Sequence, residues 1–201
     1  MKRGIKQMKK LILVTSPPAS GKTYVSKQLA KALSHVVYLD KDTLIPLSKQ
    51  IFAVAGQEYD RSSEFFNKNI RDYEYETIVA LAMEALDYDD IVLINAPFTQ
   101  EIRNAAYIHA LKEKLSEKGA TLAVVWVQTE IEVCRQRMIA RNSDRDTWKL
   151  THWDEYIATC NFTIPTTLDD PKVKDDLIIF KNSTDEEFAE SLKRTVALLE
   201  G

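Results

Sequence analysis

Five short apolar runs alternate along this chain with longer stretches of helical periodicity. The runs are LILVT, VVYL, IVLIN, LAVVWV and LIIF, at residues 11–15, 36–39, 91–95, 122–127 and 177–180. Strands that are apolar on both faces are buried on both faces, and helical connections return the chain to a parallel neighbour. We therefore expect an α/β fold, a three-layer α/β/α domain on a five-stranded parallel sheet with right-handed crossovers.

Helical periodicity and end signals place the segments between these strands. Helices are expected over about 21–33, 100–117 and 130–141. The segment between the second and third strands is expected to be helical as far as residue 86, with breaks at Pro46 and Gly56. A final helix is expected to begin at a capping box formed by Thr184 and Glu187.

Composition limits what such a domain can do. The chain has 201 residues, 45% of them apolar, and no internal repeat, so we expect one domain over residues 1–201. A net charge of −3 disfavours a protein that coats nucleic acid or an anionic membrane, and no apolar run approaches the ~20 residues that span a bilayer. The basic first ten residues precede too short an apolar run for a signal peptide, so we expect a cytoplasmic protein. The two cysteines, Cys134 and Cys160, form no motif of a zinc site or disulfide scaffold.

Ligands of parallel sheets bind beyond the carboxyl ends of the strands, and the first strand is followed there by SPPASGKT at residues 16–23. This segment meets the pattern GxxxxGK[ST] except at its first position, where Ser16 replaces glycine. Gly21 lets the backbone approach a phosphate, Lys22 reaches the β- and γ-phosphates, and Thr23 offers its hydroxyl to Mg²⁺. We therefore expect ATP and Mg²⁺ as cofactors. The nucleotide-binding residues expected at this turn are Ser16, Ala19, Ser20, Gly21, Lys22, Thr23 and Tyr24.

With this loop and an arginine-rich segment at 135–145, the chain resembles the P-loop kinases, and within them the small group similar to zeta-toxin-like and chloramphenicol-phosphotransferase-like proteins. The resemblance runs from Leu11 to Leu199. It implies a P-loop NTPase fold with a small helical lid at about 142–160 and an acceptor-site insertion at about 43–88. It also implies an ATP-dependent phosphotransferase whose partner is a small molecule bearing a hydroxyl group.

Two aspartates follow the second strand, Asp40 and Asp42. The resemblance maps the catalytic base onto one of them, because kinases of this kind place an acid there to accept the proton of the attacking hydroxyl. We assign the base to Asp42 and the metal-bound waters to Asp40. The alternative is that Asp42 only caps the following helix.

Asn95 and Ala96 end the third strand, where P-loop motor ATPases carry an Asp-Glu pair. The missing water-activating carboxylate argues against a hydrolytic motor and for transfer to a bound acceptor. It also departs from kinase relatives that carry an aspartate at this place. Asn95 either hydrogen-bonds substrate or a water of Mg²⁺, or it is a buried amide that satisfies backbone groups.

Arg137 and Arg141 are four residues apart on one helix face. Their spacing resembles the entry to the lid of nucleoside-phosphate kinases, where the first arginine packs near the adenine and the second reaches phosphates. Arg145 is then placed as an arginine finger on the γ-phosphate, and Asn182 lies where relatives wrap the adenine. The alternative for these arginines is a solvated helix with salt bridges to Asp144 and Asp146.

Two other functions stay open. One is a nucleotide-binding P-loop protein with weak NTPase activity and a regulatory role, which the departures at Ser16 and Asn95 suggest. The other is a toxin-like or nucleic-acid-end kinase, although the acidic charge makes nucleic acid an unlikely partner. Arg61 and Arg71 are candidates for an anionic acceptor, or solvated side chains. The sequence leaves the acceptor and the oligomeric state undetermined.

Overall fold

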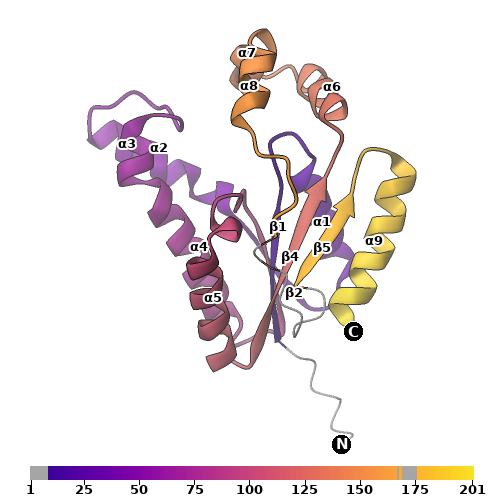
Figure 1. Ribbon diagram of the computed structural model, residues 1–201. Coiled ribbons are helices and arrows are strands. Elements are labelled where there is room, and N and C mark those ends of the chain that lie inside the picture. The colour runs from indigo at the N-terminus through magenta and orange to yellow at the C-terminus, as the bar shows by residue number, and fades with distance from the viewer. Residues whose placement is uncertain (1–8, 167, 169–175) are drawn as a thin grey trace, which may run out of the picture.

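A computed structural model describes residues 9–166, 168 and 176–201, without the side chains of residues 144 and 145. Its centre is a five-stranded parallel sheet in the order β2-β3-β1-β4-β5, which confirms the expected sheet (Figure 1). The strands are β1 (Lys9–Thr15), β2 (Val36–Asp40), β3 (Ile91–Asn95), β4 (Ala120–Gln128) and β5 (Leu177–Lys181). In this order β1 lies between β3 and β4, so the residues that follow these three strands meet at one edge of the sheet.

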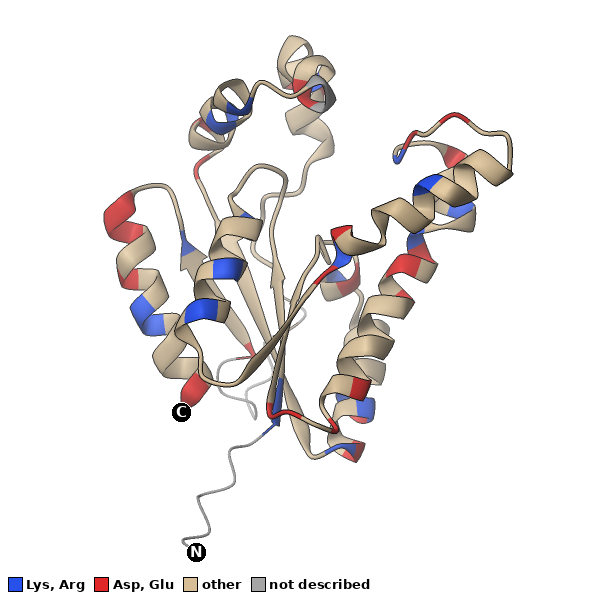
Figure 2. Cartoon of the chain, turned by 180° about the vertical axis from the view of Figure 1, so that it is seen from behind, with Lys and Arg blue, Asp and Glu red and all other residues tan. Residues whose placement is uncertain are grey.

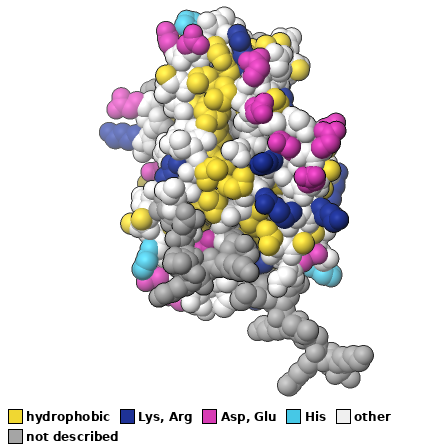
Figure 3. All heavy atoms as spheres, turned by 45° about the vertical axis from the view of Figure 1, so that its right-hand side comes forward, with side chains coloured by type: hydrophobic (Ala, Val, Ile, Leu, Met, Phe, Trp, Pro, Cys, Tyr) yellow, Lys and Arg dark blue, Asp and Glu magenta, His cyan; other side chains and the backbone are white. Residues whose placement is uncertain are grey.

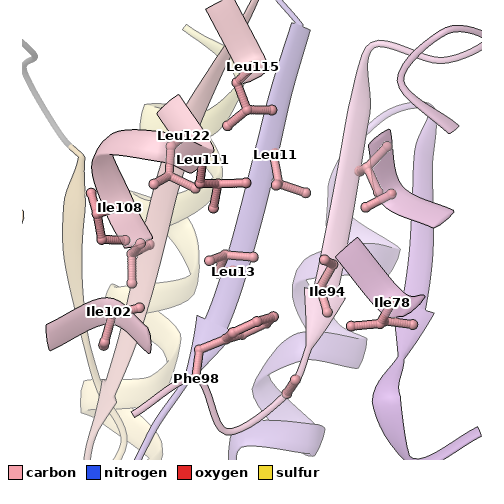
Figure 4. Close-up of a cluster of buried hydrophobic side chains, with 14 of the residues drawn as sticks. Leu11, Leu13, Ile78, Ile94, Phe98, Ile102, Ile108, Leu111, Leu115 and Leu122 are labelled. Atoms are coloured by element: carbon pink, nitrogen blue, oxygen red, sulfur yellow. The ribbon is translucent and has the colours of Figure 1, made fainter. Parts of the chain in front are cut away.

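Helices cover both faces of the sheet, as a three-layer fold requires (Figure 1). One face carries α1 (Lys22–Ala32) and α9 (Asp185–Glu200), and the other carries α4 (Arg71–Ala85) and α5 (Ala105–Glu117). Alternate residues of β1 pack into opposite layers because side chains of a strand alternate. Leu11 and Leu13 pack with the α4 and α5 layer, shown in Figure 4, whereas Ile12 packs with α1 and α9.

The segment between β2 and β3 contains a turn, η1 (Lys41–Leu44), and two helices before α4, namely α2 (Ile45–Val54) and α3 (Glu64–Asn69). Pro46 lies in the first turn of α2, and Gly56, with φ of 66°, follows the end of that helix, as the break signals predicted. Phe52, Phe66 and Ile70 form a small core of their own there. The turn that bears Asp42 and this satellite core therefore belong to one contiguous segment.

The prediction of one continuous helix over 100–117 is wrong, because the helix is interrupted. A short turn, η2 (Glu101–Arg103), is followed by Asn104, whose side chain accepts hydrogen bonds from the amides of Ala106 and Tyr107 and caps α5. Asparagine competes for backbone amides and favours such a cap over a helix interior. At the other end of the chain, Thr184 caps α9 as expected.

Three helices form the upper part of the molecule beyond the sheet, with α6 (Ile131–Arg141) followed by α7 (Asp144–Thr151) and α8 (Trp153–Thr159) (Figure 1). Asn142 ends α6 in a left-handed conformation, with φ of 45°. Lys and Arg residues are interspersed with Asp and Glu residues along the helices that flank the sheet (Figure 2). In the space-filling view, apolar side chains gather in a strip down the face turned to the viewer (Figure 3). Within the described residues, no helix combines the length and apolar character needed to cross a bilayer.

Candidate nucleotide-binding site

The loop between β1 and α1 contains two residues with a left-handed backbone conformation. Ala19 and Gly21 both have left-handed φ values, 61° and 83°, a pattern that builds anion-binding concavities. A Cβ atom at Gly21 would lie 2.5 Å from Nδ2 of Asn182, so only glycine fits. Ser16, in place of the first glycine, is buried and donates its hydroxyl to the carbonyl of Pro17 at 2.9 Å.

The carbonyl of Ser20 anchors this loop to three neighbouring elements. It accepts hydrogen bonds from Oγ1 of Thr129 at 2.9 Å, from Nδ2 of Asn182 at 2.7 Å and from Nη1 of Arg137 at 3.2 Å. Arg137 also donates through Nη2 to the carbonyl of Asn182 at 2.7 Å. The structure thus brings Arg137 and Asn182 to the loop. Sequence reasoning missed Thr129, although its place just after the end of β4 is a usable signal.

Asn95 connects three of the expected site residues, Lys22, Thr23 and Asp40. Its Oδ1 accepts from Nζ of Lys22 at 2.7 Å and from the hydroxyl of Ser26 at 3.2 Å. Its Nδ2 donates to Oδ2 of Asp40 at 2.8 Å and lies 3.3 Å from Oγ1 of Thr23. Asn95 is only 1% exposed, but the hydrogen bonds given above join it to side chains and not to the backbone groups that the second interpretation expected. It is a buried amide with satisfied hydrogen bonds, and its partners are the residues of the predicted phosphate and metal site.

Lys22 is a partly buried cation at the first position of α1. Burial lowers the pKa of its ammonium group, and the carboxylates of Asp42 and Asp40 oppose that shift. Desolvation is the largest of these effects. Any additional negative charge nearby would therefore stabilise the charged form of Lys22. Phosphate oxygens over the loop would supply that charge.

The two aspartates after β2 have different environments. Oδ1 of Asp40 accepts from the amide of Asp42 at 3.0 Å, and Oδ2 accepts from the hydroxyl of Tyr38 at 3.0 Å besides the amide of Asn95. Asp40, not Asp42, is the residue that caps η1. The carboxylate of Asp42 is exposed and makes no hydrogen bond within the described part of the chain. Both carboxylate oxygens of Asp42 are therefore without a hydrogen-bond partner among the described residues, whereas each oxygen of Asp40 has at least one.

A pocket of about 500 Å³ opens over this loop. Besides residues 16–24, its lining includes Pro97, Thr99, Arg137, Arg141 and Lys149.

Arg141 donates through Nε and Nη2 to Oδ2 of the fully buried Asp146, at 2.8 and 2.5 Å, so the salt bridge considered from the sequence is present. The side chain of Arg145 lies outside the described residues. Tyr24 is 58% exposed and its ring lies 5.2 Å from that of Phe188.

The two arginines of the segment after β2 are paired with buried carboxylates. Arg61 donates to both oxygens of Glu74, at 2.8 and 2.7 Å, and the buried Lys41 donates to Oε2 of Glu74 at 2.6 Å. Arg71 donates to Glu101 at 2.6 Å. Neither arginine is simply solvated, and Glu74 links the turn that bears Asp42 to the helices that follow it.

The side chains near Thr23 suit a magnesium ion that keeps most of its waters. In the ranges 9–166, 168 and 176–201, no group of three His, Cys, Asp or Glu side chains is placed to hold a metal. Mg²⁺ in nucleotide sites instead takes one or two protein oxygens, several waters and the substrate phosphates. The exposed hydroxyl of Thr23 and the carboxylate of Asp40 meet that requirement.

Known structures share this fold. A putative kinase from Chloroflexus aurantiacus j-10-fl matches with a TM-score of 0.59 at 17% identity, over 98% of this chain and 99% of that one. A gluconokinase from Sinorhizobium meliloti 1021 matches with a TM-score of 0.52 at 18% identity, over 96% and 97% of the two chains. The Mycobacterium tuberculosis APS kinase in complex with AMPPNP and APS matches with a TM-score of 0.51 at 19% identity, over 97% and 99%. At these identities the likeness concerns the fold.

The family of the chain follows from a match to its sequence. A comparison with curated proteins finds no match. A family model described as an AAA domain, AAA_33, matches residues 11–163. The match spans more than half of the chain and includes the loop at 16–23, Asn95, Arg137 and Arg141. The chain therefore belongs to the AAA_33 family of P-loop kinase-like domains.

Proposed function

We propose that this protein is a phosphotransferase that moves the γ-phosphoryl group of Mg-ATP to a hydroxyl group of a small molecule. The observation that carries the proposal is the continuous set of hydrogen bonds from Lys22 through Asn95 to Asp40, beside the free carboxylate of Asp42. A phosphate-binding cation, a metal-water ligand and a general base lie together at one end of the sheet. Phosphoryl transfer needs mainly such positioning and charge stabilisation.

Each residue has a role in this proposal. The amides of the loop at 16–23 and the ammonium group of Lys22 bind the β- and γ-phosphates. Mg²⁺, when bound, neutralises charge on these phosphates, with Thr23 as its ligand and Asp40 holding its waters. Arg137 and Asn182 hold the loop next to the nucleotide base, and Tyr24 lines the same pocket.

The chemical step is a direct transfer. The acceptor oxygen forms a bond to the γ-phosphorus as the bond to the β-γ bridging oxygen breaks, and ADP leaves. The proton of the acceptor hydroxyl passes to Asp42. Arg141 and Arg145 stabilise the charge on the phosphoryl group as it moves, and the segment 142–160 acts as a lid over the nucleotide. The segment 43–88 forms the acceptor site.

Nucleotide binding and a metabolite screen test the proposal. Purified protein is titrated with Mg-ATP by calorimetry, and ADP release and phosphorylated product are then measured with a panel of polyols, sugars, nucleosides and aminoglycosides. Wild type should bind ATP, and at least one compound should raise ADP release with an equal amount of product. Lys22→Ala should lose both. Absence of ATP binding by wild type would refute the proposal.

A nucleotide-binding protein without efficient transfer is the second candidate. The neutral amide at Asn95, where kinase relatives carry an aspartate, favours it. ATP turnover that no acceptor raises, and that Asp42→Asn leaves unchanged, would support this candidate over the first. The same preparations and the same assay therefore separate the two.

A further inference from the structure

The lysine between the two aspartates of the site is buried, unlike its neighbours. Lys41 separates Asp40 from Asp42 at the start of η1, and its side chain is 3% exposed, whereas Asp42 is exposed. Lysine is almost never buried to this extent without a partner. Its Nζ lies 2.6 Å from Oε2 of Glu74 on α4 and 5.1 Å from the centroid of the Tyr75 ring. Lys41 therefore fastens the turn to α4.

The carboxylate of Asp42 has no side-chain contact that fixes its position. Asp40 lies opposite Asn95 in the sheet, and both of its carboxylate oxygens accept hydrogen bonds. Asp42 is hydrogen-bonded only through its backbone within the described residues, to Oδ1 of Asp40 and to the amide of Ile45. These contacts hold Asp42 within the turn. The position of its carboxylate therefore depends on where the turn lies, and so on Lys41.

Glu74 is a rigid anchor for this lysine. Its Oε1 accepts from Oγ of Ser48 at 2.5 Å, and Arg61 donates to both carboxylate oxygens at 2.8 and 2.7 Å. A buried charge that loses its only partner destabilises a fold strongly. Glu74 would keep Arg61 and Ser48 if Lys41 were replaced. Loss of Lys41 should thus detach the turn from α4 without leaving a buried charge unpaired.

The same part of α4 is also attached to the wall of the nucleotide pocket. The hydroxyl of Tyr75 donates to the carbonyl of Pro97 at 2.9 Å, and Pro97 lines the pocket together with Lys22. Because Glu74 and Tyr75 are adjacent, one helical turn holds both the segment that bears Asp42 and the pocket wall. A general base must lie within hydrogen-bond reach of the proton that it accepts. The distance that α4 sets between turn and pocket is therefore important for transfer.

We propose that the buried pair of Lys41 and Glu74 positions the carboxylate of Asp42 for proton transfer. Lys41 and Glu74 are positioning residues, since both side chains are 3% exposed and neither touches the reacting atoms. This inference rests on the proposed function, because it explains how the base assigned there is held. Loss of Lys41 should lower kcat and leave the binding of Mg-ATP, which takes place at the loop, close to wild type.

Turnover and ATP affinity of wild type, Lys41→Met, Asp42→Asn and the double variant test this inference. ADP release is measured with the panel compound that gives the highest rate, or with water alone where no compound raises the rate. Lys41→Met should lower kcat by on the order of 10²-fold, as a displacement of about 1 Å in a catalytic site does. The double variant should be no slower than Asp42→Asn, because a residue that acts through Asp42 has no effect once Asp42 is replaced.

Ser48→Ala is the matched control. It removes one hydrogen bond from the same carboxylate but leaves Lys41 attached to Glu74, and Ser48 is only 2% exposed. It should lower kcat far less than Lys41→Met. Urea unfolding of each variant measures how much stability each change costs. Where Lys41→Met does not fold, Lys41→Gln is used, since its shorter, uncharged side chain remains polar, and the same loss of kcat is expected.

The outcomes separate this inference from the proposed function. If Asp42→Asn stops turnover but Lys41→Met matches wild type or Ser48→Ala in kcat, the inference is wrong. A double variant clearly slower than Asp42→Asn would also overturn it, because the two residues would then act independently. If wild type binds no nucleotide, or Asp42→Asn leaves turnover unchanged, the proposed function fails and this inference fails with it.

Discussion

Replacement of Glu74 by glutamine should destabilise the fold far more than its small chemical change suggests. Glu74 is buried and accepts hydrogen bonds from Ser48, Lys41 and Arg61. Glutamine preserves the shape but removes the counter-charge of Lys41, which is 3% exposed. Removal of one partner from a buried ion pair costs about 3–5 kcal/mol. At about 2–4 °C per kcal/mol for a domain of this size, the unfolding midpoint should fall by roughly 10 °C.

The pH dependence gives this prediction a second, independent readout. Burial raises the pKa of Glu74, but hydrogen bonds from Arg61, Lys41 and Ser48 outweigh burial and hold the pKa below its ordinary value of 4.5. A group whose pKa is lower in the folded state than in the unfolded state stabilises the fold at pH values above its unfolded-state pKa. That stabilisation is lost as the pH falls through the folded-state pKa. The difference in the free energy of unfolding between wild type and Glu74→Gln should therefore have its full size at pH 7 and decrease below about pH 4.

Urea unfolding followed by circular dichroism measures both effects, and Asp72→Asn is the control. Asp72 lies on the same helix, is 73% exposed and pairs with Arg71 at 2.8 Å, so its loss should cost well under about 1 kcal/mol. Equal stabilities of Glu74→Gln and Asp72→Asn at pH 7 would refute the reasoning. So would a stability difference that does not change with pH.

Three further predictions concern the site. Gly21→Ala should weaken ATP binding at least about ten-fold in calorimetry, because the new Cβ meets Asn182 at 2.5 Å and the left-handed backbone is strained; unchanged affinity would contradict the loop geometry. Asp42→Asn should spare ATP affinity and stop product formation, whereas a larger effect of Asp40→Asn in the same assay would reverse the assignment of the base. Arg145→Ala should lower kcat by ~10³ while ATP affinity changes little; a loss confined to affinity would make Arg145 a binding residue.

The strands could be predicted from the sequence because each is a run of apolar residues with no competing pattern. Their order could not, because neighbours in a parallel sheet are chosen by packing between segments distant in the chain. The residues after Arg141 did not by themselves predict α7 and α8, which were expected only from the helical lid that the resemblance implies at about 142–160. The interruption at Asn104 was hidden for the opposite reason, since the periodicity around it continues on both sides.

The phosphate loop was predictable because its residues are contiguous and each has a local reason. The Glu74 cluster was not, since Lys41 and Glu74 are 33 residues apart and neither belongs to a motif. Thr129 was missed in the same way, because its hydrogen bond to the carbonyl of Ser20 depends on which elements pack over the loop. Local motifs thus identify the candidate phosphate loop, while the groups that hold this loop in place can be found only in the tertiary structure.

The neutral amide of Asn95 determines how many carboxylates lie beside Lys22 and Asp40. A carboxylate at this position would lie 2.8 Å from Oδ2 of Asp40, and two buried like charges at that distance raise one another's pKa. The amide instead accepts from Lys22 on one side and donates to Asp40 on the other, so it joins the two groups without adding a third carboxylate. Lys22 is then held by a neutral acceptor, which phosphate oxygens can replace more easily than they could replace an ion-pair partner. The departure from an aspartate at this position is therefore compatible with a site that binds and releases a polyanion.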